Sequence, residues 1–268
     1  IQTRLADFGP YEDAMTSRSP VIFHSLLSPY LNLGLLEPLE TICSVEEAYL
    51  QGDVPLNSAE GFIRQVLGWR EYMYWQYWRK MPDLLEKNHF RADRELPLFF
   101  WTGQTDLNCL AMVLQRALSR GYNHHIERLM ILSNFCPLAG FQPRQVLDWF
   151  MSNYLDAYPW VMAPNLIGMG LHADGGEIGT KPYISSANYI NRMSDYCQAC
   201  RYNHKKRVGA DACPFNYLYW HFLDRHDTLL RANTRMNLSM RNLDLLDQSE
   251  RRKIKELAES FLSQLDPG

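Results

Sequence analysis

Residues 121–136, GYNHHIERLMILSNFC, have the pattern of a single helix. Asn123 precedes a run of apolar residues at helical spacing, and a proline follows the last residue of the run. Because Asn is a favoured N-cap residue and proline ends helices, we predict a helix over 124–136 that Asn123 caps. His124 and His125 stand at its start. Adjacent helical side chains point in different directions, so we expect at most one of the two to face any given site.

The same helical signals recur along the chain, whereas alternating strand patterns with hairpin turns are almost absent. Asn57 and Glu60 have the spacing of a capping box at the start of a long apolar-rich segment, 58–81. Residues 61–81 are apolar almost all round, which predicts that this helix is buried on most sides. We therefore expect an all-α fold with functional loops. Further helices are expected over 105–120, ended by Gly121, from Pro143 to about Tyr154, over 214–231, and over 250–265 with Asp247 and Glu250 as its capping box, and a long Gly- and Pro-rich functional loop is expected over 159–182.

The composition excludes several classes of protein. A chain of 268 residues can bury one large core or two modest ones, and 46% hydrophobic with 13% aromatic residues is typical of a packed protein, not a disordered one. The net charge is −3, so any surface that binds nucleic acid would be a local patch. The longest apolar runs are too short to span a bilayer, and no signal peptide is visible. Because the first residue is Ile1 and not Met, we expect a fragment or a processed product.

The polar residues of helix 61–81 need an explanation if the helix is buried. Arg70 and Glu71 either pair with neighbouring helices or face a bound polar ligand, because buried charges need partners. A stripe of aromatic and amide side chains on one helix face would suit a planar heterocycle, with core packing as the alternative. This stripe consists of Gln65, Trp69, Tyr72 and Gln76.

The polar segment 197–213, CQACRYNHKKRVGADAC, holds three of the six cysteines. Such a loop with a C-x-x-C pair indicates a metal or cluster site. Zinc would accept Cys197, Cys200 and Cys213 together with His204, whereas an iron–sulfur cluster would need a fourth thiolate from elsewhere in the chain. The spacing leaves both possibilities open. The loop is also basic, which favours either a solvated surface or a phosphate contact, through His204, Lys205, Lys206 and Arg207.

Three sequence blocks, FHSLLSPYLNLGLL at 23–36, GWRE at 68–71 and GYNHHIERL at 121–129, together resemble the flavin-binding helical part of the photolyase/cryptochrome family. Cys109, followed far downstream by the C-x-x-C pair and Cys213, is similar to the pattern of a bacterial branch that carries a four-cysteine [4Fe–4S] cluster, many of whose members are (6-4) photolyases. The resemblance covers essentially the whole chain. It implies one helical FAD-binding catalytic domain over 1–268, without the α/β antenna domain of the family.

The resemblance also implies two cofactors and their ligands. FAD would be bound non-covalently, and the family's usual Thr-Ser-Arg of the phosphate loop is His24-Ser25-Leu26 here, which removes one basic contact. The residue facing flavin N5 is left open between Met162 and the nearby Asn165. The FAD-binding positions would be Tyr11, His24, Ser25, Leu27, Ser28, Arg70, Arg128 and Asp156, and the cluster ligands would be Cys109, Cys197, Cys200 and Cys213.

The activity implied is light-driven repair of UV-induced pyrimidine lesions in DNA, of the (6-4) type, with excited reduced FAD as the electron donor. His125, with His124 beside it, matches the proton donor of the (6-4) enzymes, but the second histidine of the animal-type enzymes is Leu129 here. The alternatives are a cryptochrome-type light sensor and a zinc-binding module that contacts nucleic acid. We expect a cytoplasmic monomer without membrane contact that binds a flipped lesion. Electron relay is implied for Trp149 and Trp101, with Trp160 as a further candidate, and lesion contact for Trp69, Tyr183 and Tyr189.

Overall fold

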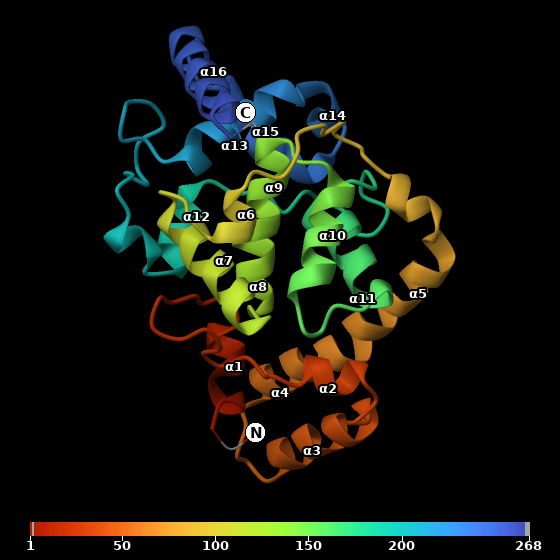
Figure 1. Cartoon of the computed structure of the whole chain (residues 1–268). Coiled ribbons are helices and arrows are strands. Elements are labelled where there is room, and N and C mark those ends of the chain that lie inside the picture. The colour runs from red at the N-terminus through yellow and green to blue at the C-terminus, as the bar shows by residue number, and fades with distance from the viewer. Residues whose placement is uncertain (2, 266–268) are drawn as a thin grey trace.

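The structure is a computed structural model that describes residue 1 and residues 3–265. Helices provide all the regular structure of this part, in which the only β-type pairings are two isolated bridges, Arg94 with Phe141 and Asn203 with Ala212. The expected all-α fold is confirmed. Figure 1 shows the first four helices at one end of the molecule, the C-terminal helices at the other, and a central group between them.

The helices fall into three groups along the chain. The first group is α1 (Leu5–Tyr11), α2 (Ser28–Asn32), α3 (Pro38–Leu50) and α4 (Leu56–Ile63), followed by the outer helix α5 (Arg70–Lys80). The central group is α6 (Phe99–Thr102), α7 (Asn108–Arg120), α8 (His125–Glu127), α9 (Asn134–Ala139), α10 (Pro143–Asn153) and α11 (Pro159–Ala163). The last group is α12 (Ala187–Met193), α13 (Pro214–Arg225), α14 (Asp227–Arg231), α15 (Asn237–Asp244) and α16 (Gln248–Ser263).

Three helical stretches are interrupted by wider, π-helical turns. Arg64–Trp69 joins α4 to α5, Arg128–Ser133 joins α8 to α9, and Pro164–Gly170 continues α11. Single π-helical turns within α-helices are frequent at functional sites, because they re-aim side chains and loosen the backbone ladder. The sequence pattern predicted the first two stretches as plain helices and the third as part of a loop.

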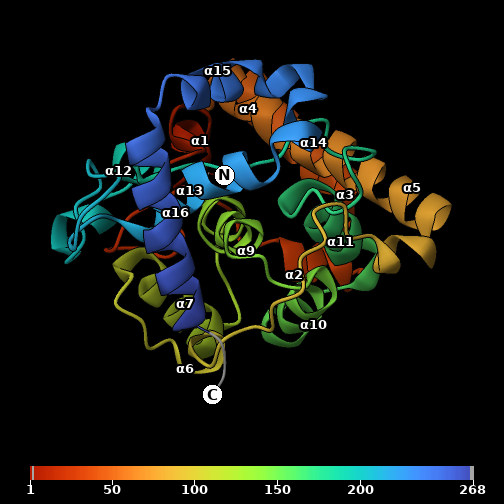
Figure 2. The ribbon, with the colours of Figure 1, turned by 90° about the horizontal axis from the view of Figure 1, so that it is seen from above.

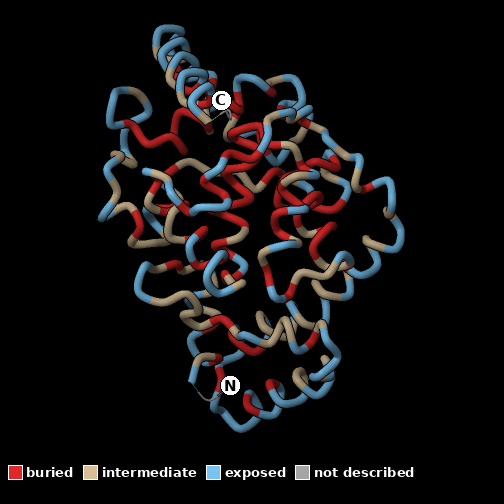
Figure 3. The backbone as a smooth tube through the Cα atoms, in the orientation of Figure 1, coloured by how far each residue is buried: buried red, intermediate tan, exposed pale blue. Residues whose placement is uncertain are grey.

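The hydrophobic core has a large and a small part. The large part surrounds α9, whose residues are all buried and which lies near the middle of the molecule when it is seen from above (Figure 2). The small part lies among α1, α3 and α4. Figure 3 shows the consequence, because buried backbone is concentrated in the central helices while the outer faces of the first group are exposed.

Two of the expected caps are wrong. The Asn57 side chain does not cap α4, which follows Pro55 and has no side-chain cap. Asn123 does not cap the helix after it either, since His124 is at the N-cap position and the Asn123 amide is used elsewhere. By contrast, Asp247 accepts from the Glu250 backbone N–H at 2.8 Å, as expected for the first turn of α16.

Other expectations are met or revised by the backbone. Gly121 ends α7 in the left-handed region (φ 61°), and Pro143 begins α10, as predicted. The expected helix 214–231 is divided into α13 and α14 at His226. The expectation that helix 61–81 is buried on most sides is wrong. In its α5 part only Met73 is buried, and Trp78 is 63% exposed to solvent.

Gly9 is a point of very close approach between α1 and α4. Its N–H donates to Ser58 Oγ at 2.9 Å, and a Cβ at this position would lie 2.8 Å from backbone atoms of Asn57 and Ser58. Such a distance is too short for non-bonded carbon and nitrogen atoms, so any larger residue would have to separate the two helices.

Gly9→Ala should therefore destabilise the protein by about 1–3 kcal/mol, as overpacking does elsewhere. The matched control is Gly61→Ala in α4, where the nearest atom, Phe8 Cε1, is 3.6 Å away and alanine is the better helix former by up to about 1 kcal/mol. The measurement is urea-induced unfolding. An unchanged midpoint for Gly9→Ala, or equal losses in both variants, would contradict the close approach.

Candidate functional site

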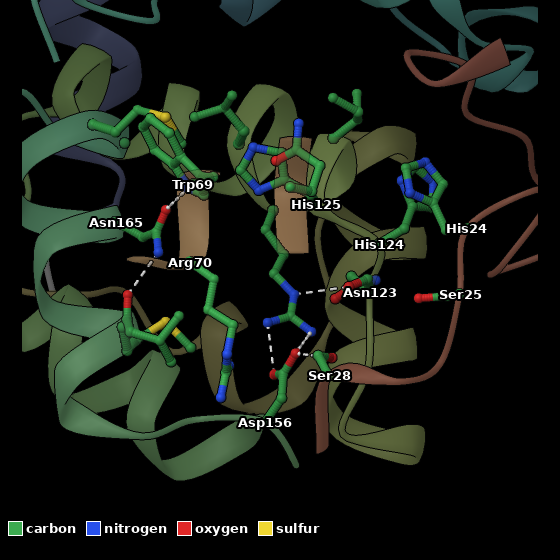
Figure 4. A pocket seen from close by; sticks show the side chains of 18 of the residues that line it. His24, Ser25, Ser28, Trp69, Arg70, Asn123, His124, His125, Asp156 and Asn165 are labelled. Carbon is green, nitrogen blue, oxygen red and sulfur yellow. Dashed lines mark hydrogen bonds and ion pairs between the residues drawn. The ribbon is translucent and has the colours of Figure 1, made fainter. Parts of the chain in front are cut away.

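A cavity of about 300 Å³ lies between the first group of helices and the central group. This volume is at the lower end of the range for small-molecule sites, about 300–1,000 Å³. All three π-helical segments contribute to its wall, through Gln65, Trp69, Leu129 and Asn165 among others. Figure 4 shows side chains from segments far apart in the sequence converging on this space. The predicted residues that line it are His24, Ser25, Ser28, Gln65, Trp69, Arg70, His124, His125, Arg128, Asp156, Met162 and Asn165.

An ion pair between Arg128 and Asp156 forms the polar end of the cavity. Arg128 Nη1 is 2.8 Å from Asp156 Oδ1, and Nη2 is 3.2 Å from Oδ2. The Ser28 hydroxyl donates to the same carboxylate at 2.6 Å. Burial alone would raise the pKa of Asp156, but the Arg128 guanidinium lowers it below its usual value. Both groups are therefore charged at neutral pH, and each neutralises the other.

The surroundings of Arg128 hold it in place. Its Nε donates to the Asn123 carbonyl at 2.7 Å, and the guanidinium lies 4.0 Å from the centre of the Tyr154 ring. The Tyr154 hydroxyl in turn donates to Asn123 Oδ1 at 2.8 Å. Asn123 is thus a support for Arg128 and not a helix cap, because its side chain and carbonyl are both committed to this cluster.

Arg70 differs from Arg128 in having no anionic partner among the described residues. Its Nη1 donates to Asn32 Oδ1 at 2.6 Å, its Nη2 donates to the Leu31 carbonyl at 3.2 Å, and its guanidinium lies 4.6 Å from the Trp160 ring centre. All of these partners are neutral. Burial lowers the pKa of Arg70, yet arginine stays charged at neutral pH. Arg70 is therefore an unneutralised cation at the cavity wall, which suits a phosphate.

Both adjacent histidines line the cavity, which corrects the expectation that only one would. The reason is that His124 has extended backbone (ψ 160°) before the helix begins, so the helical rotation between neighbours does not apply to it. His124 stacks on His24 with ring centres 4.4 Å apart, and neither ring nitrogen of His124 has a hydrogen-bond partner within the described structure. Burial lowers the pKa of His124 to about 2.

His125 presents its ring to the cavity. The surrounding protein atoms lower the pKa of His125 to about 4, first by burial and then by the charge of Arg128. Both histidines are thus neutral at pH 7, and each neutral imidazole offers one N–H donor and one acceptor. The cavity therefore joins a polar end to hydrogen-bonding rings and to an apolar wall that includes Ile126, Leu166 and Met169.

Four of the predicted cofactor and lesion residues lie outside the cavity wall. Tyr11 is 51% exposed and stacks on Phe23, because α1 turns it to the surface. Leu27 precedes α2 and is not among the residues that line the cavity. Tyr183 and Tyr189 are half-buried against the large core, with Lys181 and Arg192 over their rings. Of the helix stripe, Gln65 and Trp69 face the cavity, whereas Tyr72 and Gln76 do not.

The two predicted relay tryptophans differ in their surroundings. Trp149 is buried, donates to the Phe100 carbonyl at 3.0 Å, and touches Phe150, which lines the cavity. Trp101 is 54% exposed at the end of α6. Sequence reasoning missed Asn32 and Tyr122 as wall residues, although both lie within the blocks 23–36 and 121–129 that carry the resemblance.

The four cysteines predicted as ligands lie near one another. Burial raises the pKa of Cys109, and the neighbouring thiols of Cys213, Cys197 and Cys200 raise it further. Nevertheless, residues 1 and 3–265 contain no group of three or more His, Cys, Asp or Glu side chains arranged to hold a metal ion. A single zinc ion requires thiolates about 3.8 Å apart, whereas each thiolate of a four-iron cluster binds a different iron and needs more separation.

The basic loop between these cysteines carries less free charge than its sequence suggests. Lys206 lies 2.8 Å from Asp211, and Arg207 lies 3.0 Å from Glu250. Exposed pairs of this kind contribute little to stability, so they remain able to exchange partners.

Comparison with known proteins places the chain. No family model matches it. Over 266 residues it is 49% identical to a protein of Agrobacterium fabrum named (6-4) photolyase, in a match that covers 99% of this chain and 52% of that protein. The chain belongs to the photolyase/cryptochrome family. A 93-residue part is also 41% identical to an uncharacterized protein of Acanthamoeba polyphaga mimivirus, over 35% of this chain and 72% of that protein.

Solved structures agree with this photolyase/cryptochrome assignment at the level of the fold. A bacterial class III photolyase from Agrobacterium tumefaciens matches with a TM-score of 0.54 and 18% identity, over 97% of this chain and 53% of that one. A cryptochrome from Synechocystis sp. matches with a TM-score of 0.56 and 16% identity, over 98% and 52%. The chain thus spans about half the length of these proteins and has the fold of their helical part.

The buried, neutral His124 predicts acid sensitivity. In the unfolded chain, the pKa of this histidine is about 6.5, whereas in the folded protein it is about 2. Below pH 6.5 the unfolded state therefore binds a proton that the folded state does not, and the folded state loses stability as the pH falls. At pH 5 this loss should be about 2 kcal/mol. His124→Gln should reduce the difference in unfolding free energy between pH 7.5 and pH 5 by about that amount, as measured by urea titration at both values. If the unfolding free energies of the variant and the wild type had the same pH dependence, His124 would not be buried in its neutral form.

Proposed function

We propose that this chain is the helical catalytic part of a DNA photolyase that repairs UV-induced pyrimidine lesions, of the (6-4) type, with reduced FAD as its light-driven electron donor. The observation that carries the proposal is the cavity, which combines an unneutralised arginine, buried histidine nitrogens without partners and an apolar wall. It is supported by membership of a family that generally binds FAD and by the identity with a protein named (6-4) photolyase.

The wall residues fit the parts of FAD. Arg70 and Asn32 would hold the diphosphate, because Arg70 is the cation that has no carboxylate partner in the described part of the chain. The Arg128–Asp156 pair would face polar edges of the cofactor, with Ser25 at the same end. The Ser28 hydroxyl is already donated to Asp156, so its role is to orient that carboxylate. Bound FAD would supply one electron to the lesion after reduction and excitation by light.

The first test of this proposal concerns Arg70. Arg70→Ala should weaken FAD binding by at least tenfold, because a charge-assisted phosphate contact is lost. Arg79→Ala is the matched control, since Arg79 lies on the same helix, is exposed and is not part of the cavity wall. Both affinities can be measured from flavin fluorescence. Equal affinity of Arg70→Ala and wild type would contradict the assignment, as would FAD bound elsewhere in a holoprotein structure.

The cysteine region is proposed to hold a [4Fe–4S] cluster through Cys109, Cys197, Cys200 and Cys213. Four thiolates are the usual ligand set for such a cluster. Besides burial, the neighbouring cysteines raise the pKa of Cys109 and of Cys213, which supports the proposal. Such an effect requires that α7 place Cys109 close to the loop. The cluster would stiffen a loop that has few buried residues of its own.

Cys109→Ser should therefore lose iron and sulfide. Cys136→Ser is the control, because Cys136 is also buried but lies outside the group of four. Iron and sulfide analysis of the purified proteins gives the result. Unchanged iron and sulfide in Cys109→Ser, together with loss of metal in His204→Ala, would show instead a zinc site of three cysteines and one histidine.

His125 is proposed as the proton donor to the lesion. Its ring faces the cavity, and the negative charge of a nucleotide cofactor and of DNA would raise its pKa from about 4 toward neutrality. Trp149 and Trp101 would serve a separate step, the light-driven reduction of the bound flavin, since Trp149 contacts the wall residue Phe150. Trp69 lines the cavity and is the proposed lesion contact.

His125→Ala should keep FAD and lesion binding but lose repair by about 10²–10⁴-fold, the usual contribution of general acid catalysis. Trp149→Phe should slow light-driven flavin reduction, yet repair at the wild-type rate once the flavin has been reduced chemically. The assay follows repair of (6-4) DNA under blue light with pre-reduced protein. Repair by His125→Ala at the wild-type rate would mean that His125 is only a wall residue.

The remaining proposals concern the setting of this activity. The partner would be UV-damaged DNA, and the full protein would include an antenna domain and act as a cytoplasmic monomer. Within residues 1 and 3–265, every helix is too short or too polar to span a bilayer. A cryptochrome-type light sensor is the second candidate, because the Synechocystis cryptochrome shares the fold equally well. Repair of lesion-bearing DNA in vitro separates the two.

A further inference from the structure

A buried hydrogen-bond network lies between the cysteine region and the cavity, and the steps described above make no use of it. Its centre is Glu127, whose side chain is fully buried. Arg116 and the Tyr196 hydroxyl both donate to Oε1 of Glu127, and Asn123 donates to Oε2 at 2.8 Å. Arg116 also donates to the Tyr196 hydroxyl at 3.0 Å. A buried carboxylate needs such partners, so each of these bonds matters to the position of the others.

One end of the network reaches two of the predicted cluster ligands through adjacent residues. Tyr196 immediately precedes Cys197, and Asn108 immediately precedes Cys109. The Asn108 side chain donates to the Tyr196 carbonyl at 2.8 Å, which joins the two cysteine-bearing segments directly. The position of Tyr196 is therefore tied to the geometry of both cysteines.

The loop beyond Tyr196 is held mainly by polar contacts, among them the Asn216 amide, which donates to the carbonyls of His204 and Lys206 at 2.8 Å. Tyr196 is fully buried, whereas in the segment 197–213 only Ala212 and Cys213 are buried. Segments with few buried contacts open at low free-energy cost. A group bound by the cysteines would therefore add to these polar contacts, and a change in the loop would act on Tyr196 first.

The other end of the network reaches the cavity. The Asn123 side-chain amide donates to the Glu127 carboxylate, and the Asn123 backbone carbonyl accepts from Arg128 Nε at 2.7 Å. Asn123 and Arg128 both line the cavity, and the Arg128 guanidinium bonds to the Asp156 carboxylate as well as to Asn123. Any movement of the Glu127 carboxylate thus changes the support of Arg128.

We propose that Tyr196 and Glu127 couple the cysteine region to the cavity, so that filling the cysteine site increases the affinity of the cavity for FAD. This inference rests on the proposed function for the identity of both occupants. A filled site holds the loop, and the loop holds the Tyr196 hydroxyl on Glu127. An empty site lets the hydroxyl withdraw, and the buried carboxylate loses a donor. Couplings between sites in proteins change affinity by about 5- to 150-fold, and they act equally in both directions.

The experiment compares FAD dissociation constants of cluster-loaded and cluster-free protein, measured by flavin fluorescence, in three forms. In wild type, removal of the cluster should weaken FAD binding at least fivefold. In Tyr196→Phe, which deletes one hydroxyl and keeps the ring, the two states should bind FAD with the same, weaker affinity. Tyr202→Phe is the matched control, because Tyr202 lies near Cys200 and Cys213 and its hydroxyl makes no hydrogen bond in the part of the chain described. It should keep the full wild-type difference.

A merely structural role of Tyr196 would weaken FAD binding by the same factor in both states and leave the difference intact. That outcome, or a wild type with no difference, overturns the inference. If Tyr196→Phe does not fold, Asn108→Ala serves instead, because it removes only the amide that holds the Tyr196 carbonyl and should reduce the coupling. A wild-type protein that binds no FAD, or no iron, overturns the proposed function and this inference with it. This outcome differs from failure of the coupling alone, in which both cofactors bind but the FAD affinity does not change with the cluster.

Discussion

The ion pair of Arg128 and Asp156 is the interaction on which the cavity depends. It joins the π-helical turn after α8 to the segment between α10 and α11, and Ser28 adds the start of α2. Both side chains are largely removed from solvent, at 14% and 12% exposure, so the loss of either would leave an uncompensated buried charge. The supports of this pair, the Asn123 carbonyl and the face of Tyr154, therefore fix one wall of the site as firmly as the core does.

This pairing decides the electrostatics of the rest of the site. With Arg128 neutralised, Arg70 is left as the positive charge that a phosphate would meet, and the histidines remain neutral because their burial is not offset by a nearby free carboxylate. His124 lies 3.7 Å from Glu127, but that carboxylate already accepts from Arg116, Tyr196 and Asn123. The cavity thus has one charged end and one neutral, ring-lined end, an asymmetry that matches a cofactor with a diphosphate and a heterocycle.

The sequence was sufficient for the fold class, since proline, glycine and apolar spacing are local signals that survive folding. The family resemblance pointed to part of the cavity wall, including Arg70, Arg128 and Asp156. The sequence failed where tertiary packing decides. Asn123 has the composition of a cap but is recruited by Glu127 and Tyr154. Helix 61–81 has the composition of a buried helix, yet α5 lies on the outside and exposes Trp75 and Trp78. Tyr11 was assigned to the cofactor by resemblance, but its helix turns it outward. Asn32 lies within the block 23–36 that carries the resemblance, yet only the structure shows that it lines the cavity.

The central claim is that one chain of this fold holds a flavin in the cavity beside Arg70 and a cluster at the four cysteines. The most direct measurement is the visible absorption spectrum of the purified chain after anaerobic reconstitution with FAD, iron and sulfide, followed by gel filtration. The account predicts that the protein fraction retains the structured bands of a bound flavin above a broad iron–sulfur absorption. A colourless protein fraction, with all the flavin eluting as the free cofactor, would contradict it.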